Sequence, residues 1–182
     1  AFGLAACGPR EAAVKFKSSD ITGITIGGDF SMPDHTGKPR SLSDFKGKVV
    51  LVFFGYAQCP DVCPTTLAEV AAAMKELGSK ANDVQLLLVT VDPERDTPEL
   101  LAQYVAAFHP SFLALRGSQA ELDATAKLFK VFYAKVPSPS GGYTMDHTAG
   151  TFVFDKQGRP RLLVSYGAGA SVFAHDLAQL LR

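Results

Sequence analysis

Two cysteines four positions apart are the residues of this chain best suited to do chemistry. Cys59 and Cys63 lie in residues 55–64, directly after an apolar run and where a helix is predicted to begin. This spacing brings two sulfur atoms close enough to share one metal ion or to form a disulfide. The partial positive charge of a helix N-terminus favours the thiolate, which is both nucleophile and metal ligand. Prolines at positions 60 and 64 rigidify the loop. Two cysteines that only filled space in a core would not require such a rigid loop.

A histidine supplies the third candidate ligand. His147 stands just before residues 150–154, a predicted strand that approaches the cysteine loop in a thioredoxin-like layout. Thioredoxin-like reductases carry a proline where this chain has Ala149, so the site favours metal binding over disulfide exchange. Thiolate and imidazole ligands suit copper, and the thiolates favour Cu(I), whereas zinc more often takes four ligands. The other histidines are predicted to be structural or at the surface: His35, His109 and His175.

Carboxylates beside these ligands are candidates for supporting or partner-facing roles. Asp146 is placed to hydrogen-bond the imidazole, or equally to cap the adjoining turn, and Asp61 lies between the two cysteines. Asp92 opens residues 92–97, which follow a second apolar run and therefore reach the same edge of the sheet. Either Asp92 belongs to a charged rim that orients a partner or the copper loop, or the segment is a turn. In that turn Thr97 would cap the next helix and Arg95 would pair with Asp96 or Glu94.

The elements that must position these residues follow an α/β pattern. Apolar runs at residues 49–54 and 84–91 predict central strands, and helical spacing between Pro64 and Gly78 predicts a crossover helix. Further helices are predicted after Thr97-Pro98, from a capping box at residues 118–121, and over residues 173–181. Residues 150–154 and 161–166 form a predicted antiparallel hairpin. The order predicts a thioredoxin-like fold, a central mixed sheet flanked by helices, with an added N-terminal β-hairpin at residues 28–40.

Three motifs together resemble the Sco (SCO1/SenC) family. They are CPDVCP at residues 59–64, VDPERDTP at 91–98 and DHT at 146–148, in the family's order and spacing, and the likeness extends from about residue 24 to the C-terminus. The resemblance implies that Cys59, Cys63 and His147 bind one copper ion, as Cu(I) or Cu(II). It also implies an upstream copper donor and delivery to the CuA centre of cytochrome c oxidase subunit II, as a metallochaperone rather than a classical enzyme. The alternative is a thiol–disulfide oxidoreductase that keeps the CuA cysteines reduced.

The first residues predict a membrane anchor. Residues 4–7, LAAC, resemble the bacterial lipoprotein cleavage box, in which a peptidase cuts before a cysteine that carries lipid. We expect residues 1–6 to be the remnant of a signal segment, residues 7–20 to be the lipid-bearing Cys7 with a tether, and residues 21–182 to be the copper-binding domain. The expected location is the periplasmic side of the inner membrane. A frayed apolar terminus with an incidental cysteine is the competing interpretation.

Composition and a further motif exclude other classes. The 18 Lys and Arg residues balance 18 Asp and Glu residues, which argues against a nucleic-acid partner. No apolar run approaches the roughly 20 residues that span a bilayer. Three cysteines do not make a disulfide scaffold at this length. Residues 41–48 also resemble the segment before the catalytic strand of peroxiredoxins, but neither cysteine has the upstream proline and hydroxyl residue that position a peroxide.

Overall fold

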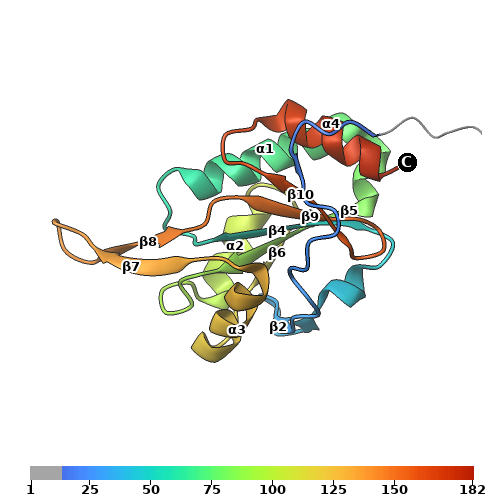
Figure 1. Ribbon diagram of the computed structural model, residues 1–182. Coiled ribbons are helices and arrows are strands. Elements are labelled where there is room, and N and C mark those ends of the chain that lie inside the picture. The colour runs from blue at the N-terminus through green and yellow to red at the C-terminus, as the bar shows by residue number, and fades with distance from the viewer. Residues whose placement is uncertain (1–13) are drawn as a thin grey trace, which may run out of the picture.

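The computed structural model describes residues 14–182, which form a central sheet with helices packed on both faces (Figure 1). The sheet has six strands in the order β1-β10-β9-β4-β5-β6. These strands are β1 (Ser19–Asp20), β4 (Val49–Gly55), β5 (Val84–Thr90), β6 (Leu113–Leu115), β9 (Thr151–Phe154) and β10 (Pro160–Val164). The helices are α1 (Val62–Leu77), α2 (Pro98–Ala106), α3 (Gln119–Phe129) and α4 (Ala170–Leu180), with short 3₁₀ helices at Leu42–Phe45 and Gly78–Asp83.

The two central strands explain where the loops of interest lie. Every residue of β4 and β5 is buried, as expected of strands covered on both faces. The two strands are parallel, and Gly55 at the end of β4 stands opposite Thr90 at the end of β5. The cysteine loop and the segment that begins at Asp92 therefore leave the same edge of the sheet, as the apolar runs predicted.

The helices cover the sheet from both sides. Helices α1 and α4 pack on each other over one face, while α3 lies on the other (Figure 1). The ring of Phe129 at the end of α3 packs edge-on against Phe54 and Phe152, with ring centroids 5.2 and 5.3 Å apart. Aromatic pairs of this geometry add to the stability gained by burial alone. None of the helices among residues 14–182 is both long and apolar enough to cross a membrane.

The predicted fold class is confirmed, including the N-terminal hairpin. Strands β2 (Met32–Pro33) and β3 (Pro39–Arg40) pair antiparallel around a turn that the Asp34 side chain organises. The predicted strand at residues 161–166 is shifted by one to two residues, since β10 is Pro160–Val164. Thr97 caps α2 and Ser118 caps α3 through a capping box, as the sequence indicated.

Two parts of the fold differ from the expected organisation. A second hairpin, β7 (Tyr133–Pro137) and β8 (Tyr143–His147), projects from the body of the molecule and was not predicted (Figure 1). Residues before the expected domain boundary at residue 21 also contact the body of the molecule. Strand β1 pairs with β10, and the backbone N–H groups of Lys17 and Ser18 donate to the carboxylate of Asp176 in α4.

Candidate metal centre

The cysteine loop lies where β4 ends and α1 begins. Cys59 sits in the loop, and Cys63 is the second residue of α1. The backbone N–H of Cys63 donates to the Cys59 sulfur at 3.4 Å. A backbone N–H of the first helical turn thus points at the Cys59 sulfur, as expected of a site that stabilises thiolate. Both cysteines are buried and unbonded to each other.

The third candidate ligand comes from the unpredicted hairpin. His147 is the last residue of β8, and its Nδ1 atom lies 3.0 Å from the carbonyl oxygen of Thr148. Since a carbonyl only accepts hydrogen bonds, Nδ1 carries the proton and Nε2 is left free to coordinate. The Nε2 atom lies 3.7 Å from the Cys63 sulfur.

The three side chains form one compact set of potential ligands. One atom from each of Cys59, Cys63 and His147 lies within 4.8 Å of the others. A cavity of about 300 Å³ opens beside them, lined by Tyr56, Cys59, Pro60, Asp61, Val62, Thr144, Met145, Asp146, His147 and Ala149. Two sulfur atoms and one imidazole nitrogen are soft and borderline donors, so the set fits Cu(I) and also accepts Cu(II). The cavity gives the set a route to the surface.

Aromatic rings hold the imidazole in place. Phe53 and Tyr56 pack edge-on against His147, with ring centroids 6.1 and 6.0 Å apart. The Tyr56 hydroxyl accepts a hydrogen bond from the backbone N–H of Met145 at 3.3 Å, which joins the end of β4 to β8. Tyr56 was not identified from the sequence as a residue of the site.

Gly55 is a second residue of the site that sequence reasoning missed. A Cβ atom at this position would lie 2.8 Å from the Cys63 sulfur and 2.8 Å from the Phe53 ring. The absence of a side chain therefore lets α1 approach the strand with its cysteine pointing inward. Gly55 comes directly after the apolar run at residues 49–54, and a glycine at the end of a buried strand is a signal of close backbone approach.

The two thiols are unequal. The hydrogen bond with the Cys63 thiol lowers the pKa of Cys59 to about 4 against the opposing effect of burial. The same hydrogen bond and deeper burial raise the pKa of Cys63. The pair therefore retains one proton, on Cys63, and carries one negative charge on the more accessible Cys59.

Asp92 links the loop after β5 to the hairpin that carries His147. Its buried carboxylate pairs with Arg95 and accepts a hydrogen bond from the Tyr143 hydroxyl at 2.8 Å. Arg95 also donates to the backbone oxygen of Tyr143 at 2.8 Å, and its guanidinium stacks 3.8 Å from the centre of that ring. Residues 92–97 were interpreted either as a charged rim or as a turn that caps the next helix. Thr97 does cap that helix, but Arg95 pairs with Asp92 rather than with Asp96 or Glu94. Asp92 is thus a buried connection and does not face outward.

Asp96 ties the same loop to the cysteine loop, and its role was not predicted. It is 0% exposed, and one carboxylate oxygen accepts from the Thr90 hydroxyl at 2.6 Å and from the Ala57 N–H at 3.1 Å. Burial raises the pKa of Asp96, although these hydrogen bonds oppose the rise. Its other oxygen and the Tyr104 hydroxyl are buried without a hydrogen-bond partner among the described residues.

The remaining candidates lie at the rim or elsewhere. Asp146 is exposed and makes no hydrogen bond to His147, because neighbouring residues of a strand point to opposite faces. The Nδ1 atom of His147 is instead bonded to the carbonyl oxygen of Thr148. Asp61 precedes α1 at the surface, where it accepts a hydrogen bond from the Tyr166 hydroxyl at 3.1 Å. Cys7 lies outside the described residues. The other histidines contact their own neighbourhoods: His35 with Ala114, His109 with Ser111 and His175 with Asp176.

The fold and the site define a class. A thioredoxin-like sheet carries a Cys-x-x-x-Cys pair at the start of α1 and a histidine beside it, which is the arrangement of a thioredoxin-like metal-binding protein. The family model SCO1/SenC matches residues 19–182, and the chain belongs to this family.

Curated relatives and solved structures agree with this assignment. The chain is 38% identical to the SCO2-like protein of Rickettsia prowazekii over 138 residues, which cover 75% of this chain and 67% of the relative. It is 37% identical to the human mitochondrial SCO1 homologue over 126 residues, 68% of this chain and 42% of that protein. The structure of Bradyrhizobium japonicum ScoI with copper bound is similar, with a TM-score of 0.78 and 39% identity over 85% of this chain and 99% of that one. Apo Sco1 of Thermus thermophilus has a TM-score of 0.81 and 42% identity over 93% and 99% of the two chains.

Proposed function

We propose that this protein binds one copper ion through Cys59, Cys63 and His147 and carries it as cargo. The observation that supports this most directly is the convergence of the three donor atoms within 4.8 Å. The free Nε2 atom of His147 and the negative charge on Cys59 suit a cation, and the donor types suit copper. The copper-bound relative from Bradyrhizobium japonicum adds support from outside the chain.

A copper titration tests this proposal. The reduced protein should take up one Cu(II) per chain and develop thiolate-to-copper charge-transfer absorption, and Cu(I) should compete with a chromogenic chelator at the same stoichiometry. His147→Ala should change the Cu(II) spectrum and weaken binding by at least tenfold. His109→Ala, which removes an imidazole outside the site, is the matched control and should leave both unchanged. An unaltered spectrum and affinity in His147→Ala would refute the three-ligand site.

The cargo is delivered to the CuA centre of cytochrome c oxidase subunit II, in line with the family's role in oxidase assembly. The cavity beside the ligands leaves room for an incoming sulfur from a partner. Mixing the copper-loaded protein with the soluble CuA domain of subunit II should build the CuA absorption bands. Protein loaded at the same copper concentration but carrying Cys59→Ser should not build them faster than free copper does.

The second candidate function is thiol–disulfide exchange, which the inequality of the two cysteines favours. Cys59 would attack a partner's disulfide and form a mixed disulfide, and Cys63, after losing its proton, would displace the partner from Cys59. The two cysteines together would give up two electrons and the single proton held by Cys63, and the partner's disulfide would gain them and be released as one thiol and one thiolate. A dithiol reduction potential near that of thioredoxin, about −270 mV, supports this function, and a potential well above about −180 mV excludes it.

Lipid attached to Cys7 would determine where the protein is located. A bacterial lipoprotein would be held on the periplasmic side of the inner membrane, so that the site meets a partner embedded in the same membrane. Cells fed radiolabelled palmitate should label the protein, and Cys7→Ser should abolish the label and release the protein from the membrane fraction. A labelled Cys7→Ser protein would contradict the assignment.

A further inference from the structure

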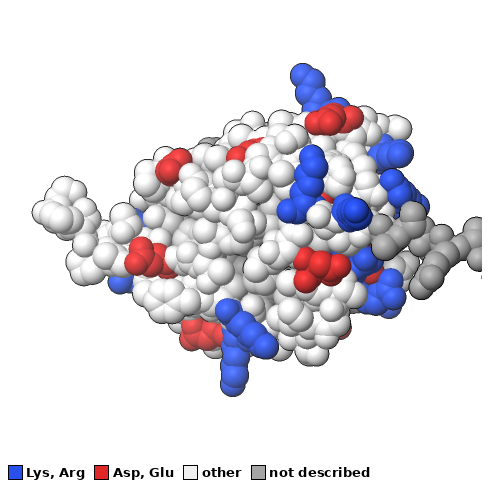
Figure 2. All heavy atoms as spheres, turned by 45° about the horizontal axis from the view of Figure 1, so that its top comes forward, with Lys and Arg blue, Asp and Glu red and all other residues white. Residues whose placement is uncertain are grey.

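The net charge of zero conceals a separation of charge between the two ends of the molecule. Figure 2 shows Lys and Arg side chains gathered towards the end at which the described chain begins, with few at the opposite end of this face. We call this the basic end and define it by eight residues around the starts of β4 and β5 and the β9–β10 turn. They are Lys15, Lys46, Lys48, Lys80, Lys156, Arg159, Arg161 and Arg182.

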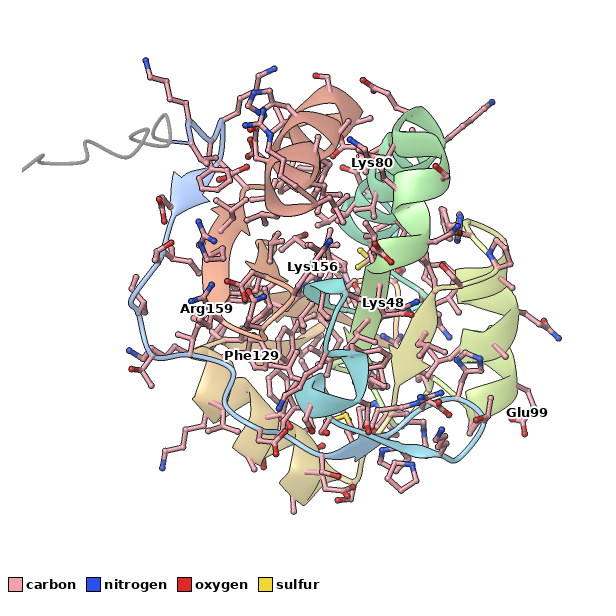
Figure 3. The ribbon with its side chains drawn as sticks, turned by 90° about the vertical axis from the view of Figure 1, so that its right-hand side faces the viewer. Lys48, Lys80, Glu99, Phe129, Lys156 and Arg159 are labelled. Atoms are coloured by element: carbon pink, nitrogen blue, oxygen red, sulfur yellow. The ribbon has the colours of Figure 1, made fainter. Side chains whose placement is uncertain are left out.

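Most of this charge is not neutralised nearby. Arg159 and Arg161 share one partner, Asp155, and Lys156 lies 3.9 Å from Asp83. Within the described residues, the other members of the basic end form no ion pair. Four of those are exposed: Lys15, Lys46, Lys80 and Arg182. Figure 3 looks onto this end, with Lys48 and Lys156 near its middle, Lys80 above them and Arg159 to their left.

Exposed aliphatic side chains lie among these cations. Val14 is 42% exposed and shares a hollow of about 210 Å³ with Lys156, Arg161 and Arg182. Ile24 is 46% exposed and lines a second hollow, of about 480 Å³, with Arg159 and Arg161. Cations interspersed with protruding aliphatic groups are the combination that binds at the headgroup level of a bilayer.

The site end lacks this excess of positive charge. Around Cys59 and His147, Arg95 pairs with the buried Asp92 and Lys135 pairs with Glu94, while Asp61 and Asp146 are exposed carboxylates with no ion pair among the described residues. Strand β4 connects the two ends, and its seven residues span about 23 Å. An anionic surface would therefore attract the basic end more strongly than the site end.

We infer that the basic end is a docking surface for anionic phospholipid headgroups. The described chain begins at this same end, beside Val14 and Phe16. Docked in this way, the molecule presents its cysteines and histidine away from the bilayer, towards a partner that projects from it. This inference depends on neither copper binding nor lipidation of Cys7.

Vesicle co-sedimentation of the full chain made without lipid tests the inference. The protein should sediment with vesicles of phosphatidylcholine and phosphatidylglycerol at 3:1, and should stay in solution with phosphatidylcholine alone or in about 0.5 M salt. Lys15→Gln, Lys46→Gln and Lys80→Gln combined should weaken partitioning about a hundredfold, at about fivefold for each side chain. The matched control combines Lys38→Gln, Lys127→Gln and Lys130→Gln, which removes the same charge from exposed lysines outside the basic end, and should change partitioning less than threefold.

Three results would overturn the inference. The first is no sedimentation with phosphatidylglycerol vesicles, and the second is equal loss in the two triple variants, which would indicate general charge attraction only. The third is tighter binding to a DNA duplex than to the vesicles at equal anion concentration, which would indicate a nucleic-acid surface. Unchanged thermal unfolding and copper stoichiometry in both variants show that any loss of vesicle binding is not a loss of folding.

Discussion

Adding one methyl group at Gly55 is the smallest change that should disturb the geometry of the metal centre while keeping all of its ligands. Gly55→Ala keeps all three ligands but places a Cβ atom 2.8 Å from the Cys63 sulfur, 2.8 Å from a Phe53 ring carbon and 3.2 Å from Leu88. An ordinary contact begins at about 3.4 Å, so the sulfur or the strand must move by about 0.6 Å. The core around it is fully buried, which leaves little room to absorb the movement.

The expected magnitudes follow from this conflict. Overpacking costs about 1–3 kcal/mol, and replacing glycine returns about 0.4–1 kcal/mol by restricting the unfolded chain. We therefore expect the free energy of unfolding to fall by about 1–2 kcal/mol and Tm to fall by about 5 °C. Copper affinity should fall tenfold to a hundredfold, which is the usual cost of disturbing the support of a metal ligand.

The assay combines thermal unfolding of the apo protein with copper competition against a chelator. Gly117→Ala is the matched control, since a Cβ there would lie 2.8 Å from Glu121 and 3.0 Å from Met32, a similar conflict at the start of α3. The control should lose stability and keep its copper affinity. If Gly55→Ala binds copper with unaltered affinity and spectrum, or if Gly117→Ala loses affinity equally, the argument that Gly55 positions the Cys63 sulfur is refuted.

Three further variants test the groups that support the site and the fold. Arg95→Gln should raise amide hydrogen exchange across β7 and β8 and weaken copper binding about tenfold, and an unchanged exchange pattern would contradict the link. Asp96→Ala should cost about 2–4 kcal/mol in urea unfolding, because two buried donors lose their acceptor. Burial raises the pKa of Asp34, but hydrogen bonds from Thr36 and Arg40 outweigh it and lower the pKa to about 2. The stability that Asp34 contributes is therefore present above about pH 4 and is lost as the pH falls through about 2. Asp34→Asn should lower the free energy of unfolding by about 2 kcal/mol at pH 7 and make it depend less on pH between about pH 4 and pH 2.

The three ligands were predictable because each could be identified from residues that are close to it in the sequence. The cysteine spacing needed only a strand followed by a helix, and residues 49–54 are apolar enough to identify that strand without a partner. His147 was selected by its place before β9, and this required only the order of elements along the chain. These inferences survive errors of one or two residues in element boundaries, as the shift of β10 illustrates.

The supports of the ligands were less predictable because they depend on pairings distant in sequence. Strands β7 and β8 have five residues each, and only Met145 of them is buried, so the alternation in β8 is too short and too exposed to identify the hairpin. Their pairing is stabilised from outside, by Arg95 on a loop 48 residues away from Tyr143. The burial of Asp96 was likewise invisible, since its partners Thr90 and Ala57 become neighbours only when β4 and β5 pair.

The three ligands therefore rest on two supports of different strength. The cysteines lie in the loop between β4 and α1 and at the start of α1, where the surrounding residues are buried. The carboxylate of Asp96 accepts a hydrogen bond from this loop at Ala57. His147 belongs to a hairpin whose two strands pair only with each other. The hairpin contacts the body through Tyr56, Arg95 and Asp92, and also through hydrogen bonds and an ion pair of β7 with Gln119, Asp123 and Glu94. Loss of a cysteine-side support should lower copper affinity and global stability together. Loss of a hairpin-side support should lower copper affinity with little change in unfolding, because few core contacts are lost. The ratio of these two effects in a variant thus reports which half of the site has been disturbed, and it distinguishes Gly55→Ala from Arg95→Gln without a new structure.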